Sequence, residues 1–336
     1  MQHQLPALPD TVNWGYFDAS LKPVLTVRSG DIVQIETVSH NAGHAPELSM
    51  DEGVCRIFDE VKERGPGAHI MTGPILVLGA EPGDTLEVRV LTMRPRVPYG
   101  SNNWTPAGLL YEDFQKRRRI TIYGFDRTTT YARAEFAFDV PEGAPRLGAV
   151  FPAESVKRVP ALDKVAVPLR PHLGIGAVAP DQAGKISSTP PDRWGGNIDN
   201  WRFGTGTSMF YPVLVPGALY VAGDPHMAEG DGEISGTAIE SSLDVTVQLT
   251  LHKDFPVTTQ LLETPTHWML HAYDPDLDIA MHQAGLETLR FLVDQRGLSK
   301  DDAYSLMSVA VDFVVTQVVD QNKGVHSMVP KSLFLP

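Results

Sequence analysis

The chain has 336 residues, enough for two domains or one large β-rich unit with a sizeable core. Hydrophobic residues make up 42% and charged residues 21% of the sequence, which excludes a disordered or fibrous protein. The net charge of −13 would repel nucleic acid and acidic membrane surfaces, so we expect neither as a partner.

Cysteine content and the apolar segments bear on the location of the protein. Cys55 is the single cysteine, so no internal disulfide can form. The first residues lack the basic and apolar regions of a secretory signal, and the most apolar C-terminal stretch, residues 307–319, is shorter than the ~20 residues that span a bilayer. We expect a cytoplasmic protein without a membrane segment.

The first three quarters of the chain have the pattern of short strands between turns. The 29 glycines and 27 prolines are more than an average sequence carries. Segments 24–38 and 75–93 each alternate apolar and polar residues on both sides of a turn that contains Gly-Asp, which predicts strand, turn and strand. Segment 244–253 alternates in the same way and predicts a strand with one face in a core. We expect a mainly β region over residues 11–260.

The last part of the chain, residues 261–336, has a helical pattern. Residues 276–296 place apolar side chains at helical intervals, and Gly297 follows as a stop. Ser299 begins a second predicted helix that ends near Asp320, although its valines are poor helix formers. We expect two packed helices that lie against the β-rich region.

The densest group of chemically active residues is the loop 223–240. Its first eleven residues combine three glycines and a proline with one histidine and four carboxylates. Imidazole and carboxylate suit Zn²⁺, or Ca²⁺ where more oxygens are present. The alternative is a solvated acidic turn whose aspartates cap the backbone.

Other polar segments are open to a structural or a functional interpretation. Segment 195–200 is a Gly-Gly turn with Asn and Asp, and segment 172–176 is a Gly-rich run that fits a small ligand or a strand edge. His40 and His44 lie in a loop that is either a substrate lid or inert. His267 and His271 lack the intervening Glu of a metalloprotease motif, so we expect strand or core residues. Residues 116–119, four consecutive cations, are expected to be a solvated face.

The motifs together resemble the acetamidase/formamidase family. The most specific is the string Gly230-Asp231-Gly232-Glu233 followed by residues 236–240, Gly-Thr-Ala-Ile-Glu. The others occur in the family's order over about seven tenths of the chain: residues 23–27 with Gly30-Asp31, His69 with 72–74, 79–84, 174–176, Pro190-Pro191 and 195–199.

The resemblance implies a fold, an activity and a site. The family fold is a β-sandwich (jelly-roll-like) core with peripheral helices, and its members hydrolyse short amides such as formamide or acetamide. The resemblance also implies a polar pocket with a bound divalent metal, Zn²⁺ or alternatively Ca²⁺. It is carried over to Asp199, His226 and Glu240, and further to His69 and His172.

A primary amide is a poor electrophile, so the mechanism must polarise its carbonyl, activate water and protonate the amine. We expect Asp199, His226 and His69 to hold the metal, which would activate the water. Glu240 or Glu233 would move the proton, and Asn197 would donate to the oxyanion. Substrate contacts are expected from Thr72, Gly73 and His172.

Two alternatives remain at the level of sequence. One is a non-catalytic β-sandwich protein that binds a small amide-like ligand, and the other is an amidase for a larger amide, with a pocket built by His40, His44 and residues 99–104. The two amphipathic helices favour a homo-oligomer.

Overall fold

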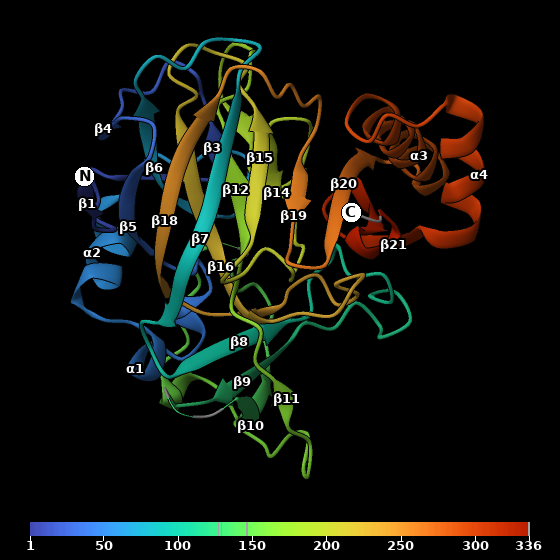
Figure 1. The fold of residues 1–336 in the computed structure, drawn as a ribbon. Coiled ribbons are helices and arrows are strands. Elements are labelled where there is room, and N and C mark those ends of the chain that lie inside the picture. Colours follow the sequence, from blue (N-terminus) through green and yellow to red (C-terminus); the bar gives the residue numbers. More distant parts are fainter. Residues whose placement is uncertain (127, 129, 146, 335–336) are drawn as a thin grey trace.

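The computed structural model describes residues 1–126, 128, 130–145 and 147–334. Within them, two large β-sheets pack face to face and two C-terminal helices lie at one side (Figure 1). The fold is therefore mainly β with a sandwich core and C-terminal helices, as the sequence predicts. No helix in the described part of the chain combines the length and the apolar character needed to cross a membrane.

The first sheet has nine strands in the described residues. Its first two strands, β1 and β5, are parallel, and every other neighbouring pair is antiparallel. Their order is β1 (Gln2–Leu5), β5 (Asp31–Thr37), β18 (Leu243–His252), β7 (Thr85–Pro95), β15 (Ser208–Pro212), β19 (Leu261–Glu263), β20 (His267–Asp274), β22 (Lys323–Pro330) and β21 (Asp312–Gln317).

The second sheet carries the residues that matter most below. Its main order is β11 (Val167–Pro168), β10 (Tyr131–Asp139), β9 (Arg119–Gly124), β8 (Tyr99–Asn103), β17 (Ile239–Glu240), β16 (Tyr220–Ala228), β12 (His172–Ala177) and β14 (Gly195–Asn197). Strand β6 (Ile70–Val77) also pairs with β16 and joins β2 (Val12–Trp14) and β4 (Leu25–Val27), while β3 (Tyr16–Phe17) pairs separately with β13 (Ile186–Ser187).

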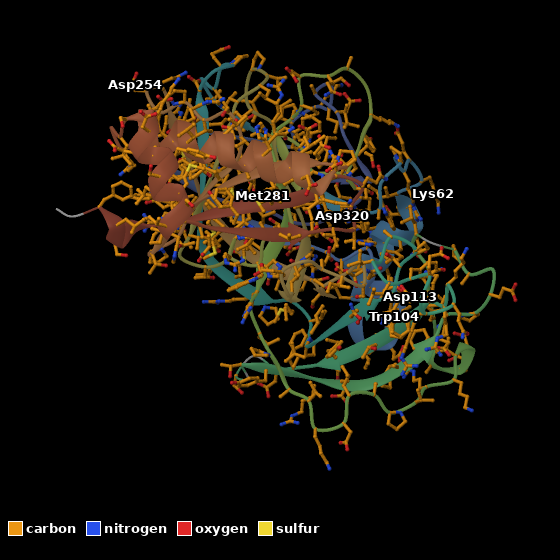
Figure 2. The ribbon with its side chains drawn as sticks, turned by 90° about the vertical axis from the view of Figure 1, so that its right-hand side faces the viewer. Lys62, Trp104, Asp113, Asp254, Met281 and Asp320 are labelled. Carbon is orange, nitrogen blue, oxygen red and sulfur yellow. The ribbon has the colours of Figure 1, made fainter. Side chains whose placement is uncertain are left out.

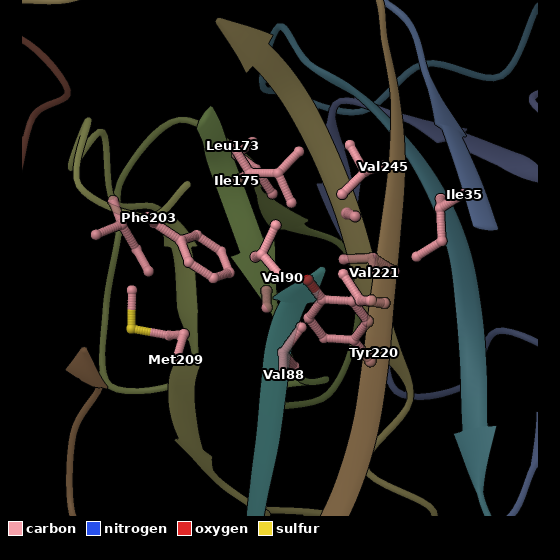
Figure 3. Packing of buried hydrophobic residues seen from close by; sticks show 14 of the residues in the cluster. Ile35, Val88, Val90, Leu173, Ile175, Phe203, Met209, Tyr220, Val221 and Val245 are labelled. Atoms are coloured by element: carbon pink, nitrogen blue, oxygen red, sulfur yellow. The ribbon is translucent and has the colours of Figure 1, made fainter. Parts of the chain in front are cut away.

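The main core lies between the sheets. In β18 the side chains of Val245, Val247 and Leu249 are buried while the residues between them are partly exposed, as period-2 alternation requires. Figure 3 shows this layer with Ile35 and Val88 of the first sheet opposite Leu173 and Ile175 of the second. Burial of each such side chain stabilises the fold by roughly 1.5–3 kcal/mol.

The predicted strand-turn-strand segments are confirmed as strands, but their turns connect different sheets. β4 pairs with β6 in the second sheet, whereas β5, after the Gly30 turn, pairs with β1 and β18 in the first. β6 and β7 are divided between the sheets in the same way. These turns therefore carry the chain across the sandwich.

The described helices are short except near the C-terminus. They are α1 (Pro46–Ser49), α2 (Glu52–Glu60), α3 (Leu277–Asp294) and α4 (Lys300–Ala310), with 3-10 turns at Ala42–His44, Ala153–Ser155 and Lys331–Leu333. Asp276 caps α3 by accepting from the N–H groups of Asp278 and Ile279, and Ser299 caps α4 by accepting from that of Asp302. The two helices contact each other as predicted.

The predicted second helix is wrong beyond Ala310. Residues Asp312–Gln317 form β21, in which Val314 pairs with His326 of β22. The β-branched valines lose side-chain freedom in a helix and fit a pleated strand, so pairing with β22 decides the structure here. Strands β19 to β22 thus continue the first sheet beyond residue 260, and a domain boundary at that residue stays a prediction.

Candidate functional site

The site is built around β16, whose residues are all buried. Asp224 has a positive φ of 49°, and Gly174 lies beneath it on β12. A Cβ atom on Gly174 would come within 2.6 Å of both Asp199 Oδ1 and Asp224 Oδ2, and within 2.7 Å of His226 Cε1. Glycine is therefore required where three site residues converge.

Both ring nitrogens of His226 lie close to carboxylate oxygens. Its Nδ1 lies 3.2 Å from Glu229 Oε2, and its Nε2 lies 3.1 Å from Asp224 Oδ2 and 3.3 Å from Glu240 Oε1. Burial alone would lower the pKa of His226, but the carboxylates of Glu240 and Asp224 raise it well above its ordinary value. Two carboxylates thus hold a buried imidazolium. His172 contacts the same Glu229 carboxylate, since its Nε2 lies 2.8 Å from Glu229 Oε2.

A second pair of histidines faces the other side of Asp224. His40 Nδ1 lies 3.8 Å from Asp224 Oδ1, and His69 Nε2 lies 3.9 Å from Asp224 Oδ2. Burial and the neighbouring His69 lower the pKa of His40 to about 3, and burial lowers that of His69, so both rings are neutral. Ser188 Oγ, 3.0 Å from His69 Nδ1, fixes the orientation of that ring. Neutral imidazoles beside an ionised carboxylate are the protonation states that metal ligation requires.

Asp199, Glu233 and Asp320 form a third group, which is made of carboxyls alone. They come from segments that are remote in sequence, and their oxygens lie within 4.8 Å of one another. Neither carboxylate oxygen of Asp199 has a hydrogen-bond partner among the described residues. Burial raises the pKa of Asp320 to about 7 and, with Glu233, raises that of Asp199 well above its ordinary value. Such a group must either retain protons or hold a cation.

β21 explains how Asp320 reaches the site. The Gly232 N–H donates to the Thr316 carbonyl at 2.8 Å, and the Val318 N–H donates back to the Gly232 carbonyl at 3.2 Å. The loop that carries Glu233 is thus paired with the C-terminal segment, and Figure 2 shows Asp320 in the middle of the molecule. Arg202 further holds this loop by a two-pronged bond to Asp231 at 2.7 and 2.9 Å.

Glu240, at the end of β17, combines a fixed and an unpaired oxygen. Its Oε1 accepts from the Ala238 N–H at 3.0 Å, while its buried Oε2 has no partner among the described residues. Burial raises the pKa of Glu240 to about 7, although the nearby His226 opposes the shift. A carboxyl with this pKa can take up and release a proton at neutral pH.

Members of these groups line one cavity of about 100 Å³: His40, His69, Asp224, Glu233, Glu240 and Asp320. Pockets for drug-sized ligands are roughly 300 Å³ or more, so this space suits a ligand of a few heavy atoms. The polar and charged side chains among its lining residues are His40, Asn41, His69, Asn103, Thr105, Arg118, Thr189, Asn197, Asp224, Glu233, Thr237, Glu240 and Asp320.

The predicted site residues are distributed over two layers. Asn197, His69, Glu233 and Glu240 line the cavity, whereas Asp199, His172 and His226 lie next to lining residues but not on the wall.

Thr72 and Gly73 also lie outside the cavity wall. The Thr72 hydroxyl donates to the Glu36 carbonyl, and a Cβ on Gly73 would meet the Tyr220 carbonyl. The structure does not bring these two together with the other candidates, so their substrate contacts stay predictions.

Several lining residues were not assigned to the site from sequence. The sequence predicts a helix end near Asp320 and leaves the loop of His40 open between a substrate lid and an inert loop. Arg118 lies on the cavity wall, so the expectation of a solvated face is wrong for this member of the cationic run. Asp224 and His40 carried a usable signal, since each is a polar residue in or next to a Gly-containing loop; Asp320 and Arg118 carried none.

The sequence and the fold were compared with known proteins. Residues 14–185 and 184–335 match the profile of the acetamidase/formamidase family. An acetamidase of Mycolicibacterium smegmatis is 29% identical over 50% of this chain and 49% of its own length, so the chain spans about half of that relative. A formamidase of Methylophilus methylotrophus is 26% identical over 94% of this chain and 87% of its own. The crystal structure of an acetamidase from Bacillus halodurans superimposes with a TM-score of 0.77 at 26% identity, covering 98% of each chain.

Proposed function

Because this chain belongs to the acetamidase/formamidase family, we propose that it is an amidohydrolase that cleaves the C–N bond of a short-chain linear amide. The products would be a carboxylate and ammonia. The observation that carries the proposal is the small polar cavity, on which Glu240, two neutral imidazoles and the Asp224 carboxylate converge. Relatives named acetamidase and formamidase agree with a formamide or acetamide type of substrate.

We further propose that His40, His69 and Asp224 hold a divalent metal, Zn²⁺ before Ca²⁺. Two nitrogens and one carboxylate are a donor set of the catalytic zinc type. Asp199 and His226, the ligands expected from sequence, also form with Asp224 a group that could hold an ion. The proposal favours His40, His69 and Asp224 because these three line the cavity, whereas Asp199 and His226 do not. A metal bound there would supply Lewis acidity toward the carbonyl and a lower pKa for water.

In this proposal Glu240 moves the proton. Its carboxyl, on the cavity wall, takes a proton from the attacking water and then gives it to the amide nitrogen as the C–N bond breaks. His226 holds the carboxylate in place, since its Nε2 lies 3.3 Å from Glu240 Oε1. Glu233, which also lines the cavity, remains the second candidate for this role.

The cytoplasmic location and the homo-oligomer are part of the proposal as well. Helices α3 and α4 lie at one side of the molecule (Figure 1). They expose the large apolar side chains of Ile279, Leu286, Tyr304 and Val309. A second copy of the chain is the proposed cover for this surface. Light scattering after size exclusion would reveal the oligomer, and a monomer would contradict it.

Ammonia release from formamide, acetamide and propionamide tests the proposed activity. The metal-replete protein should turn over at least one of them, chelation should abolish turnover, and one added metal should restore it. Absence of turnover with all three by metal-replete protein would contradict the proposal.

A further inference from the structure

An apolar pocket lies next to the polar cavity. It has a volume of about 160 Å³, and its apolar and aromatic lining residues are Trp104, Leu110, Tyr111, Phe114 and Ile234. Trp104 and Phe114 pack edge to face with their ring centroids 5.0 Å apart, which orders one side of the pocket. Leu110, Phe114 and Ile234 are 47%, 47% and 51% exposed, so the pocket offers apolar surface to a ligand from solvent or from the cavity.

A partition one residue thick separates the apolar pocket from the polar cavity. Three short segments form it, and in each of them neighbouring residues line opposite spaces. The pairs, with the residue of the polar cavity first, are Asn103 and Trp104, Arg118 and Arg117, and Gly236 and Ser235. Among the described residues, Thr105 is the one that lines both spaces. Thr105 therefore lies between them.

The Thr105 side chain is packed tightly into this partition. Its backbone N–H donates to the Ser235 carbonyl at 3.0 Å, and its hydroxyl accepts from the Ala107 N–H at 3.2 Å. A Cβ atom on Gly236 would come within 2.0 Å of Thr105 Oγ1. The Thr105 side chain thus takes the space that a side chain at residue 236 would fill, so one small side chain against a glycine closes the partition here.

The apolar pocket has the chemistry that binds an alkyl chain. Each methylene group that moves from water onto apolar surface is worth about fourfold in affinity. The polar cavity has room for a ligand of a few heavy atoms, and Thr105 lies between that ligand and the apolar surface beyond. A longer chain on an amide held beside Glu240 would therefore have to pass Thr105 to reach the pocket.

Resting on the proposed function, we propose that Thr105 sets the limit on acyl-chain length and that the apolar pocket is a latent binding site for a longer chain. Loss of the Thr105 side chain joins the two spaces. The carboxamide then stays beside Glu240 while the alkyl chain lies against Phe114 and Ile234. Thr105 acts on specificity through its volume and takes no part in the chemical step.

Ammonia release from acetamide, butyramide and hexanamide by Thr105→Ala tests the proposal. In the wild type, kcat/KM for hexanamide should lie at least about 100-fold below that for acetamide. In Thr105→Ala the ratio of hexanamide to acetamide kcat/KM should rise at least about tenfold, with a smaller rise for butyramide. Thr105→Ser loses only the methyl group, so it should give a smaller rise and provides a second test if Thr105→Ala does not fold.

Thr105→Val is the matched control, because it keeps the volume of the side chain and loses the hydroxyl. It should retain the wild-type chain-length profile, which separates blocking by volume from the hydrogen bond to Ala107. Ile234→Gln in the Thr105→Ala background makes the pocket more polar and should reverse most of the rise for hexanamide. An unchanged profile in folded Thr105→Ala, or an equal rise in Thr105→Val, would overturn the proposal and leave the hydrolase intact.

Calorimetric binding to Glu240→Gln separates chain-length selection from catalysis. This variant should bind acetamide more tightly than hexanamide, and adding Thr105→Ala should strengthen hexanamide binding at least about tenfold. If the wild type released no ammonia from any short amide but this difference in binding appeared, the hydrolase would fail and the role of Thr105 would stand. If hexanamide bound equally with and without Thr105→Ala, the role of Thr105 would fail.

Discussion

Three acids of the site have backbones in the left-handed region. The φ angles of Asp199, Asp224 and Glu233 are 52°, 49° and 45°. Non-glycine residues in this region cost of order 1–3 kcal/mol each and are retained where the surrounding structure imposes them. The ladder of β16 with β12 and the pairing of residue 232 with β21 hold Asp224 and Glu233 in this conformation, so stability is lost where the chain directs these two carboxylates to the cavity wall.

Gly174→Ala tests how closely this cluster is packed. The added methyl group would lie 2.6 Å from a carboxylate oxygen of Asp199 and of Asp224, so we expect amide turnover to fall at least about tenfold and the melting temperature to drop. Gly230→Ala is the control, because nothing lies within 4 Å of its Cβ position. Ammonia release and thermal melts of both variants provide the comparison. Normal turnover in Gly174→Ala would show that the cluster is not essential.

Glu240→Gln tests the proton carrier. The amide oxygen of Gln can still accept from the Ala238 N–H, but the side chain no longer titrates. We expect kcat for acetamide to fall about 10²- to 10⁴-fold with little change in KM. Steady-state ammonia release measures both parameters. A kcat within threefold of the wild type would move the role to Glu233.

His271 makes the stability depend on pH. Burial lowers its pKa to about 4, and Asn200 Nδ2 donates to the neutral ring at 3.0 Å. An unfolded histidine has a pKa near 6.5, so below that pH the unfolded state binds a proton that the folded state refuses. The contribution is fully present above pH 6.5 and about 3 kcal/mol is lost by pH 4.

Urea unfolding of His271→Gln at pH 7 and pH 4 measures this contribution. The variant should lose about 3 kcal/mol less than the wild type between the two pH values. His282→Gln, at an exposed position, should behave like the wild type. Equal pH dependence in all three proteins would rule out a buried neutral His271.

At the scale of elements, a buried hydrogen bond between hydroxyl groups joins α3 to the first sheet. The Thr288 hydroxyl lies 2.7 Å from both the Ala284 carbonyl oxygen and the Ser327 hydroxyl of β22. Thr288→Val keeps the shape but leaves Ser327 without this partner, so we expect a loss of about 1–2 kcal/mol in the free energy of unfolding. Thr288→Ser keeps the hydroxyl, so it should retain more of the stabilisation that these hydrogen bonds provide. Denaturant melts of both variants measure the difference. A Val variant more stable than the Ser variant would contradict the argument.

Local patterns predicted the elements that local chemistry determines. The alternation in residues 244–253 and the Ser299 cap need only neighbours in sequence, and both predictions are confirmed. β21 could not be predicted, because its valines become a strand only through pairing with β22. For the same reason Asp320 and Arg118 were missed: their presence on the cavity wall depends on strand pairings that no spacing reveals.

At the scale of the whole molecule, the sandwich provides a buried place for an excess of acids. Within the described residues, five carboxyls surround the cavity and its floor, close to the cationic Arg118 and His226: Asp199, Asp224, Glu233, Glu240 and Asp320. Buried carboxylates are stable only when they are protonated, paired or bound to a cation. A metal in the proposed position would therefore act on folding as well as on chemistry.

Metal removal should consequently lower the thermal stability. A metal that binds only the folded state at 100 times its Kd stabilises it by about 2.7 kcal/mol, which corresponds to several °C in Tm for a chain of this size. Scanning calorimetry should show a lower Tm after chelation and its return with Zn²⁺. His40→Ala should melt at the same temperature with and without chelator, since it lacks one proposed ligand. A wild-type Tm that ignores both chelator and Zn²⁺ would contradict a resident metal and would leave shared protons as the means by which the carboxyls are accommodated.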